Sequence, residues 1–224
     1  MPAPKRKDFR RSLDGPALTA YVRAQLQALF PDGTPVDAGD VVAAAAERAR
    51  HCFAHIRHPA FGDADTTVFD HLHGDQYTMF LYYASNSAFV AGDVTLAKKL
   101  FLLNKALNGF FCLYDTVLPP VMFLNHALGT VIGRGTYGNY LLVTQNVTFG
   151  VDGDRTPVIG EGVIVYGGAL IAGATTIGDR TVVAANAALR NADIPAESVV
   201  AGTSPDLIVR PRKRRLSETF FDLP

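Results

Sequence analysis

The chain has 224 residues, of which 48% are apolar and 19% charged, so it can bury a core and is not globally disordered. It carries 21 lysines and arginines against 21 aspartates and glutamates, which gives no sign of a nucleic-acid-binding surface or an acidic tail. The first twelve residues are polar and basic, and no apolar run approaches the roughly 20 residues of a membrane helix. The sequence therefore predicts a cytoplasmic protein without a secretory signal or membrane span, and with Cys52 and Cys112 buried and unpaired.

Residues 1–120 are predicted to form an α-helical domain, because apolar residues recur there at helical intervals and glycines are few. Asp93 is a candidate N-cap, and Pro119 with Pro120 prevents a helix from continuing. Four or five helices are expected, and the clearest are a helix between Pro16 and Pro31 and helices over residues 37–57, 75–90 and 93–113.

Residues 121–209 follow a period of six. Small or polar residues, many of them glycine, fill the positions between the aliphatic ones. Helices and ordinary strands have periods of 3.6 and 2, so this pattern favours neither. The aliphatic residues in register are Ile159, Val165, Ile171, Ile177, Val183 and Leu189.

A period of six suits one short strand plus one tight turn, and three such units make a triangular coil. One aliphatic side chain per unit points inward, and coils must stack to bury it. The pattern thus predicts a parallel β-helix of about four to five coils, in an α+β protein whose residues 210–224 form a basic tail. The alternative is a β-sandwich in which the spacing is a coincidence.

The β-rich half resembles the hexapeptide-repeat acyltransferases, and within them the serine acetyltransferases. The motif over residues 124–133, LNHALGTVIG, resembles that family's Asp-His-Ala-Thr-Gly segment with its following aliphatics and glycine. Residues 145–150, 153–157 and 200–209 resemble its Gln-x-Val-Thr-Leu-Gly segment, its Gly-Asp-Arg-His-Pro loop and its Ala-Gly-x-Pro-Ala-x-Ile-Val close. The resemblance implies a left-handed β-helix, acetyl-CoA as co-substrate, no metal, and a homotrimer or a dimer of trimers.

The resemblance also implies that His126 is the catalytic base, which would take the proton of an acceptor hydroxyl as its oxygen attacks the thioester. Asp115 is the candidate carboxylate that orients His126, or it caps a turn. Asp75 lies near a predicted helix start, where it could face the acceptor or cap the helix. His126 could instead be a structural residue at a corner of a coil.

Asn125, Arg155 and Thr156 are the candidate acceptor-binding residues. Asn125 stands where the family has an acceptor-binding Asp, and Thr156 stands where it has a loop His. Asn cannot make the charge-assisted contact that an ammonium group requires. The acceptor is therefore left open between serine or a similar amino acid and the hydroxyl or amine of a sugar. Arg155 could also be a solvated loop residue.

Small residues beside the turns would let the donor's pantetheine approach the backbone, and a basic tail would suit its phosphates. The same small residues also meet the needs of coil bends, and the tail could simply be solvated. The candidate donor-binding residues are Gly167, Gly168, Ala184, Ala185, Ala201, Gly202, Arg212 and Lys213.

His51 and His55 lie one helical turn apart, but a metal site would need further ligands from elsewhere. Two other functions are weighed against acyl transfer. A β-helix carbonic anhydrase would need three histidines, whereas His126 is the only one in the predicted β-helix. A non-catalytic scaffold of the same fold would have no use for His126.

Overall fold

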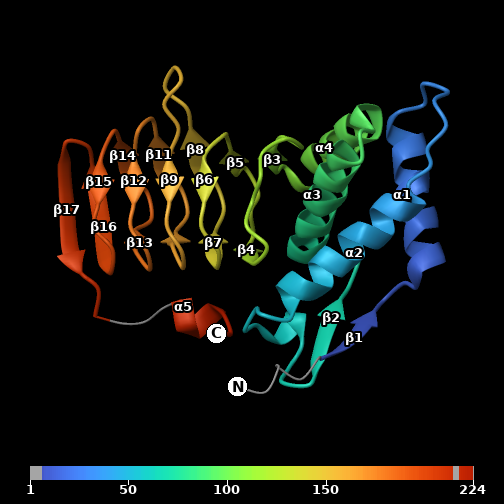
Figure 1. Ribbon diagram of the computed structural model, residues 1–224, viewed down its shortest axis with the longest axis horizontal. Coiled ribbons are helices and arrows are strands. Elements are labelled where there is room, and N and C mark those ends of the chain that lie inside the picture. The colour runs from blue at the N-terminus through green and yellow to red at the C-terminus, as the bar shows by residue number, and fades with distance from the viewer. Residues whose placement is uncertain (1–6, 214–216, 224) are drawn as a thin grey trace.

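A computed structural model describes residues 7–213 and 217–223 as a helical domain followed by a parallel β-helix (Figure 1). The helical domain begins with a small parallel sheet, which the sequence analysis did not predict, made of β1 (Asp8–Arg11) and β2 (Thr66–Phe69). Its helices are α1 (Gly15–Leu29), α2 (Gly39–Phe53), the 3-10 helix η1 (Pro59–Phe61), α3 (Gly74–Val90) and α4 (Val94–Asn108).

The helix ends follow local capping. The prediction that Asp93 caps α4 is confirmed, because its Oδ1 accepts the Leu96 N–H at 2.9 Å. The prediction that this helix runs to residue 113 is wrong, because Gly109 adopts φ 60°, a left-handed conformation that ends helices. Helix α2 also ends earlier than predicted, at Phe53.

Helix α3 is the centre of the helical domain and packs against both α2 and α4. Most of its residues are buried, including the polar Gln76, Ser85 and Asn86. Gln76 accepts the Asp70 N–H and donates to the Ala60 carbonyl at 2.8 Å, which fixes the start of the helix. The N-terminal end of α3 is therefore held firmly where it meets the β-helix.

The β-helix has about five turns, and its strands form three parallel rows that run along the three sides of the coil. The first row holds β4 (Met122–Leu124), β7 (Leu141–Val143), β10 (Ile164–Val165), β13 (Val182–Val183) and β16 (Ser198–Thr203). The second row holds β3 (Phe111–Cys112), β5 (Val131–Ile132), β8 (Thr148–Gly150), β11 (Leu170–Ala172) and β14 (Ala188–Arg190). The third row holds β6 (Thr136–Tyr137), β9 (Val158–Ile159), β12 (Thr176–Ile177) and β15 (Asp193–Ile194).

The six aliphatic residues predicted to point inward are all buried, at 2% exposure or less. Val165 pairs with Val183 and Ile171 with Leu189, eighteen residues further along the chain in each case. Eighteen residues are three units of six, so each regular coil contributes one inward side chain per side. The six-residue spacing in the sequence therefore equals the length of one side of the coil.

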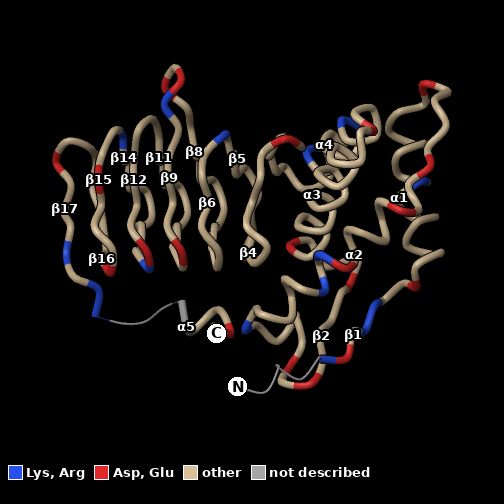
Figure 2. Tube along the Cα trace, in the orientation of Figure 1, with Lys and Arg blue, Asp and Glu red and all other residues tan. Residues whose placement is uncertain are grey.

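One loop interrupts this regularity. Tyr137 pairs with Ile159, twenty-two residues further on, because residues 151–157 leave the coil between β8 and β9. Figure 1 shows this loop projecting beyond the neighbouring turns, and Figure 2 shows that it carries charges of both signs. Asp152 anchors it, since its Oδ2 contacts the guanidinium groups of Arg155 and Arg190.

The C-terminal segment is not a free tail where the structure describes it. Strand β17 (Asp206–Pro211) pairs antiparallel with β16. Helix α5 (Ser217–Phe220) is followed by Phe221, which is fully buried and bridges to Ile56 in the helical domain. The end of the chain thus returns to the first domain. None of the described helices is long and apolar enough to cross a membrane.

Replacing Ile177 by Ala should destabilise the protein by about 2–5 kcal/mol, because it leaves a cavity in a packed column of side chains. The matched control is Thr176→Ala on the same strand, where the side chain is exposed and the change should stay within about 0.5 kcal/mol. Urea denaturation measures both. Equal effects of the two substitutions would contradict the inward direction of Ile177.

Asp152 should stabilise the fold in a pH-dependent way. Its hydrogen bond with Arg190 and the neighbouring charge of Arg155 hold its pKa below the ordinary 3.8. A carboxyl whose pKa is lowered on folding stabilises the protein above its unfolded pKa and loses that contribution as the pH falls through the folded value. Asp152→Asn should therefore be less stable than the wild type at pH 7.

The difference in melting temperature between Asp152→Asn and the wild type should shrink as the pH falls below about 4. Asp154→Asn is the control, since Asp154 lies in the same loop and makes no ion pair in the described part of the chain. A difference that stays constant from pH 7 to pH 3 would show that Asp152 does not act through its charge.

Candidate active site

His126 lies in the turn between β4 and β5, at the corner that joins the first and second rows of strands. Its backbone has φ 53°, and its side chain is 77% exposed. The His126 N–H donates to Oδ1 of Asp75 at 2.8 Å, and its ring Nδ1 is 3.4 Å from Oδ2 of the same carboxyl group. The imidazole is thus directed by a carboxylate on one side and open on the other.

Asp75 belongs to the first turn of α3, where it could have been a helix cap. The residue at the N-cap position is His73, whose side chain makes no capping hydrogen bond. The Asp75 carboxyl group faces His126 across the boundary between the two domains and is 11% exposed. Fifty-one residues separate the pair, so no sequence motif joined them.

Asp115, the carboxylate predicted to orient His126, lies between β3 and β4. Its Oδ2 accepts from Nη2 of Arg134 at 3.1 Å, and its buried Oδ1 has no hydrogen-bond partner among the described residues. The carboxylate in contact with the His126 ring is Asp75. The role assigned to Asp115 stays a prediction.

A groove of about 730 Å³ runs along the corner that carries His126. It crosses successive turns, which are stacked by hydrogen bonds such as Asn146 N–H to the Leu128 carbonyl and Asn186 N–H to the Gly167 carbonyl. Five predicted residues line it, namely Asn125, Gly167, Gly168, Ala184 and Ala185. The structure therefore brings one candidate acceptor residue and four candidate donor residues to a single groove next to His126.

The wall of the groove offers unused backbone donors. The N–H groups of Gln145, Gly167 and Ala185 donate no hydrogen bond within the described residues. A methyl group on Gly167 would lie 2.9 Å from Nε2 of Gln145, so the glycine lets the Gln145 side chain lie close against the backbone of the next turn. Such a surface can accept an extended ligand whose carbonyl groups need hydrogen-bond donors.

The remaining donor candidates lie elsewhere. Ala201 and Gly202 belong to β16 and pair with Ile208 and Leu207 of β17, outside the groove lining. Arg212 was expected in a basic tail, and the structure places it differently. Its side chain is 2% exposed and its Nη2 lies 2.6 Å from Glu197, so it does not extend as a solvated tail residue. Lys213 is exposed, and Arg214 and Arg215 lie outside the described residues.

The loop with Arg155 and Thr156 joins the second and third rows of strands, whereas His126 joins the first and second. Arg155 donates to Asp152 within the loop, and Thr156 is half-buried. Within one chain, these two candidates therefore lie at a different corner of the coil from His126.

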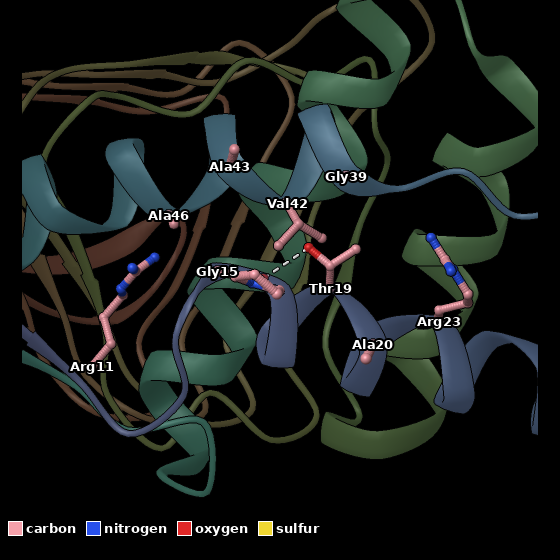
Figure 3. A pocket seen from close by; sticks show the side chains of 10 residues that line it. Arg11, Gly15, Thr19, Ala20, Arg23, Gly39, Val42, Ala43 and Ala46 are labelled. Atoms are coloured by element: carbon pink, nitrogen blue, oxygen red, sulfur yellow. Dashed lines mark hydrogen bonds between the residues drawn. The ribbon is translucent and has the colours of Figure 1, made fainter.

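A second hollow, of about 420 Å³, lies between α1 and α2 in the helical domain. Figure 3 shows Arg11 and Arg23 at opposite ends of it, with small residues such as Gly15 and Ala43 between them. None of the described side chains that line it is a carboxylate, a thiol or an imidazole. The lining of the groove has none of these groups either, but the turn that supplies its Asn125 also carries His126.

The other reactive side chains are held apart from these sites. Cys52 and Cys112 are buried, as predicted, and burial raises the pKa of the Cys52 thiol to about 11 and that of Cys112 higher still. The rings of His51, in the last turn of α2, and His55, just beyond the end of that helix, lie 4.9 Å apart. Among residues 7–213 and 217–223, no three His, Cys, Asp or Glu side chains gather as possible ligands of one metal ion.

Comparisons with known proteins agree with this architecture, although no family model matches the chain. A serine acetyltransferase of Staphylococcus xylosus is 35% identical over 104 residues, which is 44% of this chain and 47% of that protein. One from Helicobacter pylori is 33% identical over 96 residues, which is 41% of this chain and 56% of that protein. The chain thus spans about half the length of the curated relatives it matches.

The likeness to solved structures extends over both domains. The crystal structure of the Neisseria gonorrhoeae serine acetyltransferase superposes with a TM-score of 0.65 at 20% identity and covers 91% of this chain and 82% of that one. A serine acetyltransferase in complex with CoA gives a TM-score of 0.57 at 20% identity, over 83% and 73% of the two chains. This chain has the fold of the serine acetyltransferases, a helical domain followed by a left-handed parallel β-helix, and is homologous to them over part of its length.

Proposed function

We propose that the protein is an acetyl-CoA-dependent O-acetyltransferase in which His126 is the general base. The observation that carries the proposal is the placement of an open imidazole, held on its Nδ1 side by a carboxylate, beside a groove with unused backbone donors. The serine acetyltransferase relatives support the class of reaction. The complex of one serine acetyltransferase with CoA supports the choice of donor.

The reaction needs one proton transfer in each direction. Nε2 of His126 takes the proton of the acceptor hydroxyl as its oxygen attacks the thioester carbonyl carbon. A backbone N–H such as that of Gly167 stabilises the negative charge on the tetrahedral intermediate. The C–S bond then breaks, and His126 returns the proton to the leaving thiolate, which yields the acetyl ester and free CoA.

Two acceptor classes remain candidates. The serine acetyltransferase relatives favour L-serine or a similar small amino acid. Asn125, which lines the groove and carries no charge, together with Thr156 in the loop, favours a sugar hydroxyl or amine. The predicted cytoplasmic location stays a prediction, as does an enzyme without a metal.

We further propose that the enzyme works as a homotrimer, or as a dimer of such trimers, with each site shared by two chains. The separation of His126 and the loop of Arg155 on two corners of one coil supports this arrangement. A threefold axis parallel to the axis of the β-helix would bring the loop of one chain to the His126 corner of the next. It would also shield the exposed His126 ring from water.

The first test is thiol release from acetyl-CoA with L-serine and with nucleotide-linked amino and deoxy sugars as acceptors. His126→Asn should lower the rate by about 100-fold or more, because Asn tolerates a positive φ but cannot act as the base. His51→Ala is the control, since His51 lies exposed on α2. Wild-type turnover by His126→Asn would remove His126 from the mechanism.

Shared sites predict complementation between two inactive variants. Co-expressed His126→Asn and Arg155→Ala chains should regain about a quarter of wild-type activity, because in random cyclic trimers that fraction of sites combines an intact His126 with an intact loop. Each variant alone should be inactive in the same thiol assay. A mixture that stays inactive, although size-exclusion chromatography and affinity tags show mixed trimers, would place the whole site within one chain.

A further inference from the structure

We propose that Asp75, from the helical domain, is the positioning residue of His126 and fixes both its backbone and its ring tautomer. This inference rests on the proposed function, in which Nε2 of His126 must be unprotonated to accept the acceptor's proton. The sequence motif around His126 does not contain this carboxylate, and Asp115, the carboxylate expected to orient the ring, is in contact with Arg134 instead.

The two oxygens of one carboxyl group make separate contacts with the same residue. Oδ1 of Asp75 accepts the His126 N–H at 2.8 Å, and Oδ2 lies 3.4 Å from the ring Nδ1. An oxygen of a carboxylate can only accept, so a hydrogen bond between these two atoms requires a neutral ring that carries its proton on Nδ1 and leaves the Nε2 lone pair free. Contacts between catalytic groups are often long before substrate binds and shorten in the reacting complex.

The hydrogen bond from the His126 N–H to Asp75 stabilises an unfavourable backbone conformation of His126. Its φ of 53° is a left-handed conformation, which costs free energy for a residue other than glycine. The hydrogen bond from the His126 N–H to Asp75 helps to hold that conformation, and the conformation sets the direction in which the ring leaves the turn. The same carboxyl group therefore controls where the ring lies and which of its nitrogens carries the proton.

The support for Asp75 is rigid. The residue lies in the first turn of α3, the most buried helix of the first domain, and the positive end of the helix dipole favours a carboxylate there. The next residue, Gln76, is fully buried, and its side-chain amide accepts the Asp70 N–H and donates to the Ala60 carbonyl. A carboxylate at the end of a fixed helix can hold His126 in one geometry more precisely than a carboxylate on a loop could.

Asp75→Asn separates the two roles. The Asn carbonyl oxygen can still accept the His126 N–H, so the backbone stays in place. The Asn amide group, however, would donate to Nδ1 and force the proton onto Nε2, where it blocks the base. We expect kcat to fall by about 100-fold or more, with little change in the KM for acetyl-CoA, in the melting temperature or in CoA binding.

Two further variants make this result specific. Asp40→Asn removes a first-turn carboxylate from α2 and controls for the loss of a favourable helix-end charge. Asp75→Ala removes both contacts and should lose kcat as Asp75→Asn does, and in addition some thermal stability. If Asp75 only held the backbone, Asp75→Asn would keep more than about a third of wild-type kcat while Asp75→Ala would not, and that result would overturn the proposal.

The tautomer can be measured without turnover. Long-range ¹H–¹⁵N spectra of the imidazole nitrogens, with the His126 signals assigned from the spectrum of His126→Asn, should show Nδ1–H in the wild type and Nε2–H in Asp75→Asn. An Nε2–H ring in the wild type would overturn the inference even if the enzyme is active. If no acceptor supports thiol release, the proposed function fails, and the spectra still decide what Asp75 does to His126.

Discussion

The structure depends on a column of aliphatic side chains that repeats along each side of the coil. Because one inward residue recurs every six positions, each coil can close only if its three turns occur at fixed places. Parallel pairing then stacks every turn directly on the one below. Groups at a corner of the coil are consequently aligned along the axis, and a groove follows from the fold without any dedicated element.

The candidate active site lies where this regular stack meets the helical domain. The turn of His126 begins the column of turns, and the neighbouring turns with Gln145, Gly167 and Ala185 continue it into the groove. The β-helix supplies the grooved surface, and the helical domain supplies, from the end of α3, the carboxylate that contacts the His126 ring. The candidate site is therefore built by both domains.

The sequence predicts what local chemistry determines. The spacing of Ile159 to Leu189 predicted the coil, because a period of six has few other structural meanings. The N-cap at Asp93 was also predictable, because capping depends on neighbours within one helical turn. The resemblance of the motif over residues 124–133 indicated His126 and Asn125, and the small residues beside the turns indicated Gly167, Gly168, Ala184 and Ala185 of the groove lining.

Long-range contacts were not predictable from these patterns. The contact of Asp75 with His126 depends on how α3 docks against the first coil, and the pairing of Arg212 with Glu197 depends on the antiparallel return of β17. The early end of α4 depends on the left-handed conformation of Gly109, and a glycine in a sequence can equally continue a helix or end it. In each case the residue type allowed several arrangements, and the rest of the fold selected one.

The return of the C-terminal segment changes how the whole chain can come apart. An ordinary solenoid is a one-dimensional stack whose terminal repeats fray independently of the other end. Here Phe221 is buried against the helical domain, and Asp222 pairs with Arg57 and Lys7. We therefore expect the last coil and the helical domain to open together, so that native-state hydrogen exchange in the last coil and at the end of α2 reports a common opening event.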